Sequence, residues 1–235
     1  MANNPLVGAW ERVSDSRVGV SIYTGSHYAA VMAPKDRQRS SGEPTPDEAL
    51  EALLTCPALA GTYTLSGSRI TQVREPNTRP ELSNQSAVFD YTIDDDTMTQ
   101  TAVASYSSFT LRRIPSSDTG SPLIGAWELV DDTRQGVLIY TGTHYAVVQM
   151  QKERNLPKGD QYTPEEALEA LYTSGALAGT YTVSGGTLTM ERTANTRPES
   201  VGVTAVWEFT VEGDVMKGRV VSGGAADEAT WRRVS

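Results

Sequence analysis

The chain alternates short apolar runs with clusters of turn-forming residues, and this pattern predicts β-strands joined by tight turns. The runs in the first half predict eight strands, near residues 9–14, 18–23, 27–32, 61–65, 69–74, 86–93, 97–103 and 107–113. Between adjacent runs, the segments 24–26 (TGS), 66–68 (SGS) and 94–96 (DDD) have residues that suit hairpin turns. This half of the chain is therefore expected to be almost entirely β-structure.

One segment departs from the strand pattern. Residues 45–48 (TPDE) have the spacing of a capping box, with proline at the first helical position. Apolar side chains then recur at helical spacing, at Ala49, Leu50, Leu53 and Leu54. A helix this short is not stable by itself, so it must pack on the rest of the fold. We expect it near an open end of the β-structure.

The second half of the chain repeats the first. Matched segments run collinearly from end to end: 5–11 with 122–128, 22–29 with 139–146, 45–48 with 163–166, 58–64 with 176–182, 77–81 with 195–199 and 110–113 with 230–233. A polar segment rich in turn formers separates the copies. The sequence therefore predicts a domain duplication, with one domain at 1–115 and the other at 122–235.

Eight short antiparallel strands can bury their apolar faces by closing on themselves, which also removes exposed sheet edges. The expected fold class is all-β, with two tandem eight-stranded antiparallel barrels and one short helix near the mouth of each. Related single domains could have dimerised before fusion, so we expect the copies to pack as an internal pseudo-dimer. A further homo-oligomer is possible on the same grounds.

Composition narrows the partners. The formal net charge is −9, which disfavours nucleic acid and anionic membranes, and no run approaches the roughly 20 apolar residues of a membrane helix. The N-terminus has no signal-peptide pattern, and Cys56 is the single cysteine, so the protein is expected in the cytoplasm. Two histidines and one cysteine cannot build an ordinary zinc site, and the sequence predicts no metal and no cofactor.

The opening Gly-Ala-Trp of each copy (8–10 and 125–127), the Ile-Tyr-Thr-Gly hairpin, the capped helix and the terminal Arg-Arg pairs resemble the bacterial lipocalin-like domain family of the calycin superfamily. The resemblance implies that the tryptophan closes one barrel end beneath a late arginine, either Arg112 or Arg113 and either Arg232 or Arg233. It also implies that small apolar or amphipathic molecules bind in the barrel mouth. Some relatives are cofactor-free isomerases or cyclases, including pericyclic cyclases of secondary metabolism.

Two matched pairs of residues are candidates for catalysis. His27 and His144 follow equivalent Thr-Gly turns, and an imidazole can act as a general acid or base near neutral pH. Arg79 and Arg197 each precede a proline, which favours an extended backbone from which a guanidinium could grip a ligand carboxylate or carbonyl. The alternatives are a local hydrogen bond at each histidine and an internal Arg–Glu pair at each arginine.

A matched set of tyrosines and asparagines is the candidate lining of the ligand site. Tyrosine suits a cavity wall because its ring is apolar and its tip polar, although it also serves as ordinary core. The set consists of Tyr23, Tyr28, Tyr63 and Asn77 in the first copy and Tyr140, Tyr145, Tyr181 and Asn195 in the second.

The sequence favours binding of a small apolar or amphipathic organic molecule in a barrel cavity. The alternative is a non-redox, metal-free isomerase, cyclase or lyase that uses the same cavity, and a purely structural pair of filled barrels is a third possibility. The copies diverge in their last third, where residues 105–109 have no close match in 222–228. Their interiors are therefore expected to differ.

Overall fold

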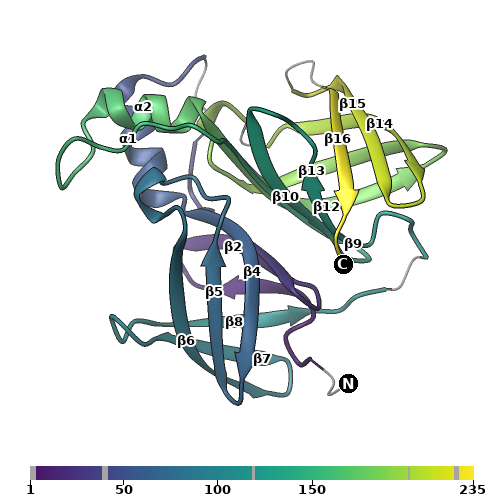
Figure 1. The fold of residues 1–235 in the computed structure, drawn as a ribbon, viewed down its shortest axis with the longest axis horizontal. Helices are drawn as coiled ribbons and strands as arrows, with labels where there is room; N and C mark the ends of the chain where they lie inside the picture. The colour runs from purple at the N-terminus through teal and green to yellow at the C-terminus, as the bar shows by residue number, and fades with distance from the viewer. Residues whose placement is uncertain (1–3, 39–41, 118–119, 201, 225–227) are drawn as a thin grey trace.

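The computed structural model describes residues 4–38, 42–117, 120–200, 202–224 and 228–235 and places them in two closed β-barrels (Figure 1). Each barrel has eight antiparallel strands, which confirms the predicted fold class. Two short helices lie side by side at one edge of the junction between the barrels (Figure 1). No helix in these described ranges is both long and apolar enough to cross a membrane.

The strands of the first barrel agree closely with the sequence pattern. They are β1 (Gly8–Val13), β2 (Arg17–Tyr23), β3 (His27–Pro34), β4 (Ala58–Ser66), β5 (Arg69–Arg74), β6 (Gln85–Asp94), β7 (Thr97–Ala102) and β8 (Ser108–Ile114). The largest difference is β4, which was expected to begin at residue 61 and begins at Ala58, because Ala58–Ala60 already pair with β3. Gly61 lies within this strand with a φ of +144°, where a Cβ would meet the carbonyl of Val73 at 2.1 Å.

The second barrel repeats this arrangement. Its strands are β9 (Gly125–Leu129), β10 (Arg134–Tyr140), β11 (His144–Gln151), β12 (Ser174–Ser184), β13 (Thr187–Asn195), β14 (Thr204–Glu212), β15 (Val215–Ser222) and β16 (Glu228–Arg233). In both barrels each strand pairs with the next along the chain, and the last pairs with the first. Every connection is therefore local, and closure leaves no sheet edge open.

A tryptophan on the first strand closes one end of each barrel. Trp10 and Trp127 are fully buried, and each indole donates a hydrogen bond of 2.7 Å to the carbonyl four residues earlier. The guanidinium of Arg113 lies 4.1 Å from the Trp10 ring centroid, and that of Arg233 lies 4.0 Å from the Trp127 centroid. Of the two arginines predicted for this contact in each copy, the second makes it.

The helices begin as predicted but pack differently. Helices α1 (Pro46–Thr55) and α2 (Pro164–Tyr172) each start with a complete capping box, at Thr45 with Glu48 and at Thr163 with Glu166. Their apolar faces meet each other, because Leu53 of α1 packs with Ala167 and Ala170 of α2. The helices therefore join the two copies beside the barrel mouths instead of covering them, since the partner helix supplies the apolar surface that each one needs.

The two barrels pack face to face through small side chains. One hydrophobic cluster spans both copies, and ten of its seventeen buried members are alanine. In the first copy these residues come mainly from β2, β3 and β4, and in the second from β10 to β13. β2 is consequently buried on both faces, with an unbroken buried run from Gly19 to Tyr23. Short side chains allow the two curved sheets to approach closely.

Two equivalent arginines bridge the copies reciprocally. Arg37 donates hydrogen bonds of 2.6 and 2.9 Å to the carbonyls of Asn195 and Thr196. Arg154 donates bonds of 2.7 and 2.6 Å to the carbonyls of Asn77 and Thr78. Exchange of the copies exchanges the two sets of contacts, as in a two-fold dimer interface. Burial lowers the pKa of Arg154 to about 10, so its guanidinium stays charged at neutral pH.

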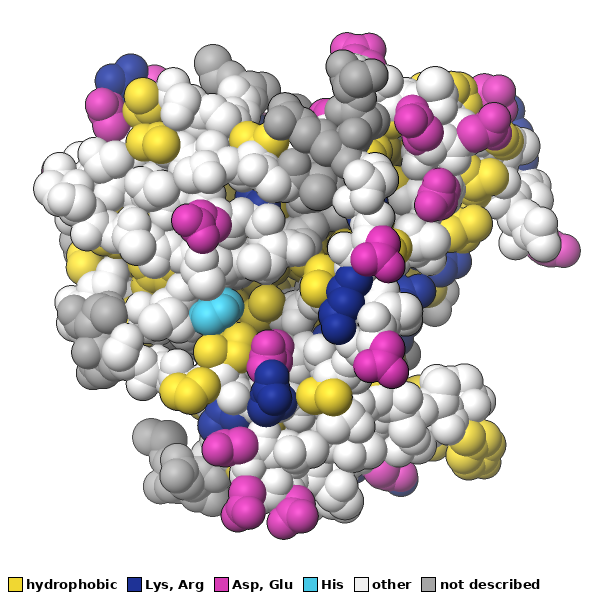
Figure 2. Space-filling model, turned by 180° about the vertical axis from the view of Figure 1, so that it is seen from behind, with side chains coloured by type: hydrophobic (Ala, Val, Ile, Leu, Met, Phe, Trp, Pro, Cys, Tyr) yellow, Lys and Arg dark blue, Asp and Glu magenta, His cyan; other side chains and the backbone are white. Residues whose placement is uncertain are grey.

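The face of the molecule seen from behind shows no broad region of one charge sign among the described residues (Figure 2). From behind, acidic side chains are scattered over both lobes, with fewer basic side chains among them (Figure 2). This distribution matches the excess of acidic residues in the sequence.

We expect Arg154→Ala to reduce the free energy of unfolding by about 1.5–3 kcal/mol, because two buried carbonyls lose charged donors. Urea denaturation followed by circular dichroism measures the change. The control is Arg219→Ala, since Arg219 and Glu208 form an exposed pair whose loss costs at most about 1 kcal/mol. Equal effects of the two variants would contradict this account of the interface.

Candidate functional site

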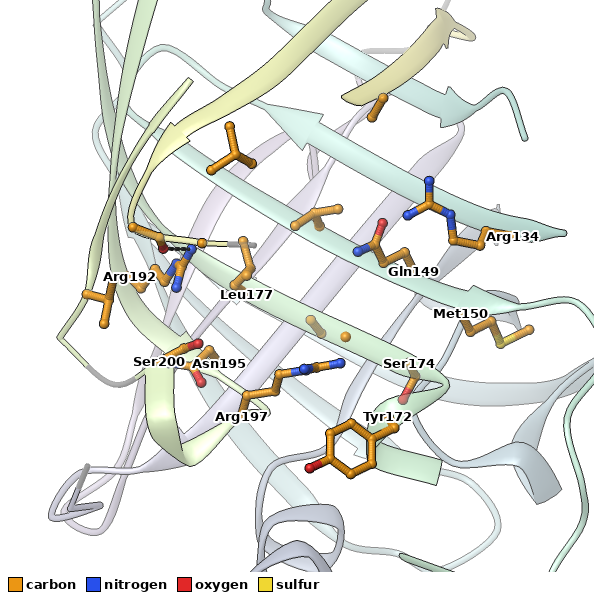
Figure 3. Close-up of a pocket in the computed structure, with 18 of the residues that line it drawn as sticks. Arg134, Gln149, Met150, Tyr172, Ser174, Leu177, Arg192, Asn195, Arg197 and Ser200 are labelled. Atoms are coloured by element: carbon orange, nitrogen blue, oxygen red, sulfur yellow. Dashed lines mark hydrogen bonds between the residues drawn. The ribbon is translucent and has the colours of Figure 1, made fainter. Parts of the chain in front are cut away.

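The second barrel contains a two-part cavity. A mouth of about 670 Å³ opens at the end of the barrel opposite the Trp127 plug and beside the end of α2. A smaller chamber of about 80 Å³ lies within the barrel. Six residues line both parts and form the neck between them: Val147, Gln149, Leu177, Arg192, Trp207 and Trp231. The mouth and the chamber therefore adjoin each other, and Figure 3 shows side chains that line the mouth.

Strand alternation explains why these side chains point inward. On β11 the inward residues are Tyr145, Val147 and Gln149, and on β13 they are Leu188, Met190 and Arg192. Successive members are two residues apart, which places them on one face of a strand. Along β13 the series runs from apolar to charged towards the mouth. The cavity therefore has an apolar floor and a polar neck.

Two polar groups that belong to the chamber lack partners. The Trp231 indole N–H and the Tyr145 hydroxyl are buried without a hydrogen bond. Burial raises the pKa of Tyr145 and of its neighbour Tyr140, so both stay protonated at neutral pH. Buried polar groups are normally paired with protein, water or ligand. The chamber thus offers hydrogen bonds that the rest of the protein does not use.

Arg192 stands at the neck. Its Nη2 donates a hydrogen bond of 2.8 Å to the carbonyl of Gly223, while its Nε is buried without a partner. Within the described part of the chain, no carboxylate pairs with it. Burial lowers the pKa of this guanidinium, and the nearby Tyr145 hydroxyl and Glu199 carboxylate act against that shift. Figure 3 shows its side chain directed into the pocket.

Two further arginines line the mouth, and both have acidic partners. Arg134 Nη2 lies 3.0 Å from Asp131 Oδ2, and Arg197 Nη1 lies 3.8 Å from Glu199 Oε1. Arg197 also extends towards Ser174 and lies 5.6 Å from the ring centroid of Tyr172 at the end of α2 (Figure 3).

The equivalent region of the first barrel is occupied. Tyr23 accepts hydrogen bonds of 3.2 and 3.0 Å from the amides of Gln72 and Gln100, and burial raises its pKa to about 12. Phe109 packs edge-to-face on Phe89, with 5.9 Å between centroids. At the positions of Gln72 and Gln100 the second barrel has Met190 and Gly218, so Tyr140 loses both amide partners.

A single cross-strand pair accounts for much of this difference. Gln100 lies opposite Phe109 in the first barrel, and Gly218 lies opposite Ala229 in the second. Two large side chains are thus replaced by a hydrogen and a methyl group. The Trp207 ring leans into part of the vacated space, since a Cβ on Gly218 would lie 3.1 Å from its Cε3.

The first barrel also has a cover that the second lacks. The guanidinium of Arg12 lies 4.6 Å from the Phe109 ring centroid, over its face. The residue at the position of Arg12 in the second copy is Leu129, and Ala229 takes the place of Phe109. At these two positions a leucine and an alanine therefore replace the cation and the aromatic ring of the first barrel.

All six predicted tyrosines lie in the barrel cores, but only Tyr140 and Tyr145 line the cavity. Tyr63 and Tyr181 instead donate hydrogen bonds of 2.5 Å to the carbonyls of Thr24 and Thr141, in the hairpins that lead into β3 and β11. These two hydroxyls hold a turn in place.

The two histidines do not line the cavity. The His27 Nδ1 lies 2.9 Å from the Ser26 hydroxyl, and its Nε2 lies 3.5 Å from Glu128 of the other copy. The His144 Nδ1 lies 2.8 Å from the Thr143 hydroxyl, and the nearby carboxylate is Glu11 of the first copy. Both imidazoles therefore belong to the junction between barrels, with the local hydrogen bond that was the alternative prediction.

The two Asn-Thr-Arg-Pro-Glu segments lead into short 3₁₀ turns, Pro80–Leu82 and Pro198–Ser200. Arg79 pairs with Glu81, with 2.6 Å between Nη2 and Oε1. The Arg79 backbone N–H donates a hydrogen bond of 2.9 Å to the Asn77 side-chain Oδ1. In the second copy, Asn195 and Arg197 line the cavity mouth, and the Asn195 Oδ1 has no partner. The Arg–Glu alternative is thus present in both copies, and only the second segment borders the cavity.

The sequence did not assign Gln149, Arg192, Trp207 or Trp231 to a ligand site. It did show that the copies diverge at Met32/Gln149, at Phe89/Trp207 and in the last third of each copy. That divergence could not be assigned to the interior without the strand register. In the described ranges, no group of three or more histidine, cysteine, aspartate and glutamate side chains is arranged to hold a metal ion.

No protein-family model matches the sequence, and no curated protein is detectably similar to it. Among solved structures, a DNA polymerase sliding clamp from Pseudomonas aeruginosa aligns with 100% of the chain and 79% of the clamp, at 9% identity and a TM-score of 0.15. A Helicobacter pylori beta clamp bound to a DNA ligase peptide aligns with 97% of the chain and 76% of the clamp, at 10% identity and a TM-score of 0.16. Scores this low carry no argument about partner or activity.

The histidines make stability depend on pH. Burial lowers the pKa of His27 and His144 below the ordinary value of 6.5, so just below that pH the unfolded chain binds more protons than the folded one. We therefore expect the urea concentration at the unfolding midpoint to decrease as the pH is lowered from about 7.5 to about 5.5. The decrease should be smaller in the His27→Gln/His144→Gln double variant. An unchanged pH dependence in the double variant would assign the effect to other groups.

Proposed function

We propose that the second barrel binds a small amphipathic organic molecule, with its apolar part in the chamber and its polar part at the neck. The observation that carries this proposal is the pair of buried, unpartnered polar groups in an otherwise apolar chamber, the Tyr145 hydroxyl and the Trp231 indole N–H. An oxygen-bearing ligand would complete their hydrogen bonds. Side chains commonly change rotamer when a ligand binds, which lets such groups turn towards the ligand oxygen.

The first barrel is proposed as a scaffold without a ligand of its own. Its central tyrosine is satisfied by two glutamine amides, and its interior near the mouth is filled by Phe109 beneath Arg12. The first barrel supports the second through the shared alanine face. Its interior also contains buried atoms without partners (Arg12 Nε, Arg74 Nε and Gln100 Oε1), but the Phe109 ring beneath Arg12 takes up the space that a ligand would need. The duplication thus leaves one copy for stability and frees the other to change.

The proposed relationship to lipocalin-like proteins is supported by the closed barrel end. A tryptophan that closes the barrel beneath a stacked arginine occurs in both copies, at Trp10 with Arg113 and at Trp127 with Arg233. In such a barrel the ligand enters from the opposite end, which is where the cavity of the second copy opens.

A cofactor-free isomerase, cyclase or lyase is the second candidate. The observation that favours it is that the unpartnered groups are preorganised donors, which stabilise negative charge as it develops on a reacting oxygen. Such an enzyme would use Arg192, Tyr145 and Trp231, and the histidines would have no direct role. A change in the mass or retention time of a bound molecule during incubation would distinguish catalysis from binding.

We expect a neutral fluorescent dye such as N-phenyl-1-naphthylamine to bind the native protein, with quenching of Trp207 and Trp231. Ala229→Phe places in the second barrel the side chain that fills the first, and it should weaken binding at least about tenfold by steric exclusion. Fluorescence titration measures the dissociation constant, and thermal unfolding checks that the variant is folded.

A second substitution that fills the cavity tests the same site at another position. Val147→Phe narrows the neck and should also weaken dye binding, while Ala30→Phe makes the matched change in the first barrel and should leave it unchanged. If the dye does not bind the native protein, or if Ala30→Phe alone abolishes binding, the proposed site in the second barrel is wrong.

A further inference from the structure

We propose that the ligand of the second barrel carries a carboxylate, or an oxyanion of similar planar shape, and that Arg192 holds it at the neck of the cavity. The inference rests on the proposed function, because it assigns the chemistry of the polar end of the same ligand. It places the charged end towards solvent and the apolar end on the floor formed by Leu188 and Met190.

The unpartnered groups of the chamber and neck share one polarity, and the unpartnered acceptor Asn195 Oδ1 lies outside them, at the mouth. The Trp231 indole nitrogen and the Arg192 guanidinium can only donate hydrogen bonds, and the Tyr145 hydroxyl is protonated and can donate. No aspartate or glutamate lines the inner chamber. The site therefore favours a ligand with hydrogen-bond acceptor oxygens. It has no anionic group that could pair with a ligand ammonium.

Arg192 also forms no ion pair within the described ranges, although the Glu199 carboxylate lies near enough to act against the lowering of its pKa. Buried charges in proteins are normally paired, because removal of a charge from water is costly. The two arginines at the mouth follow this rule through Asp131 and Glu199, whereas no carboxylate within the described ranges pairs with Arg192. A ligand carboxylate would supply the missing charge.

The position of Arg192 suits this role. It lines both the mouth and the chamber, so a group bound to it occupies the neck. Only Nη2 has a protein partner, the Gly223 carbonyl, which leaves other N–H groups of the planar guanidinium for a ligand. Two parallel bonds from one guanidinium are the geometry that favours a carboxylate over a single hydroxyl. The mouth adds to the preference, since it has three arginines and one glutamate in a chain of net charge −9.

The first barrel supplies a matched control. Arg74 is the counterpart of Arg192, and its Nε is likewise buried without a partner. It faces an interior occupied by Phe109 and the two glutamines. If substitution of Arg192 changed binding only because a buried arginine was lost, the same substitution at Arg74 should change binding equally.

The test compares decanoate with decan-1-ol, which share a ten-carbon chain and differ in charge, by displacement of the neutral dye from the full chain. We expect decanoate to bind at least about tenfold more tightly than decanol in the native protein, the value of one charge-assisted hydrogen bond. Arg192→Gln should remove this preference, Arg192→Lys should retain part of it, and Arg74→Gln should retain all of it. The dissociation constant of the dye is measured in each variant, and displacement by the two probes is calculated relative to that value.

Equal displacement by the two probes, or tighter binding of decanol, would overturn the carboxylate assignment while the dye result upholds the binding site. Loss of the preference in Arg74→Gln as well as in Arg192→Gln would also overturn it, because the effect would then be a general one. Failure of the native protein to bind the dye would instead refute the proposed function itself.

Discussion

The close contact between two alanine-rich sheet faces is the constraint on which the rest of this structure depends. Strand β2 and the adjoining parts of β3 and β4 bury one face inside their own barrel and the other against the second copy. Both faces of these segments are therefore committed to packing. The differences that create the cavity, at Gly218 and Ala229, lie at positions that face into the second barrel.

The junction also explains where several distinctive residues lie. His27 and His144 meet carboxylates of the opposite copy, and the Asn-Thr-Arg-Pro-Glu segments offer backbone carbonyls to Arg37 and Arg154. Residues that repeat in both copies are thus largely those that hold the copies together. The residues that differ, above all Gly218 and Ala229, open the interior of one barrel.

This division has a physical logic for a binding protein. A hollow barrel loses packing energy, and unpartnered polar groups within it cost more. The first barrel has a filled interior, and its Tyr23 is hydrogen-bonded. Through the shared face it stabilises the second barrel, whose own core is less completely packed. One copy can then hold a cavity with unmet hydrogen bonds, which a ligand completes.

The sequence by itself determined the duplication, the strands and the capped helices, because strand alternation, turn residues and capping boxes act over a few neighbouring residues. It also placed the tyrosines in the barrels. Only the tertiary structure decided that the helices pack on each other, that the histidines face the junction, and that Arg192 and Trp231 stand in a cavity. These outcomes depend on register and on contacts between residues more than a hundred positions apart, such as Arg37 with Asn195, and no local pattern encodes them.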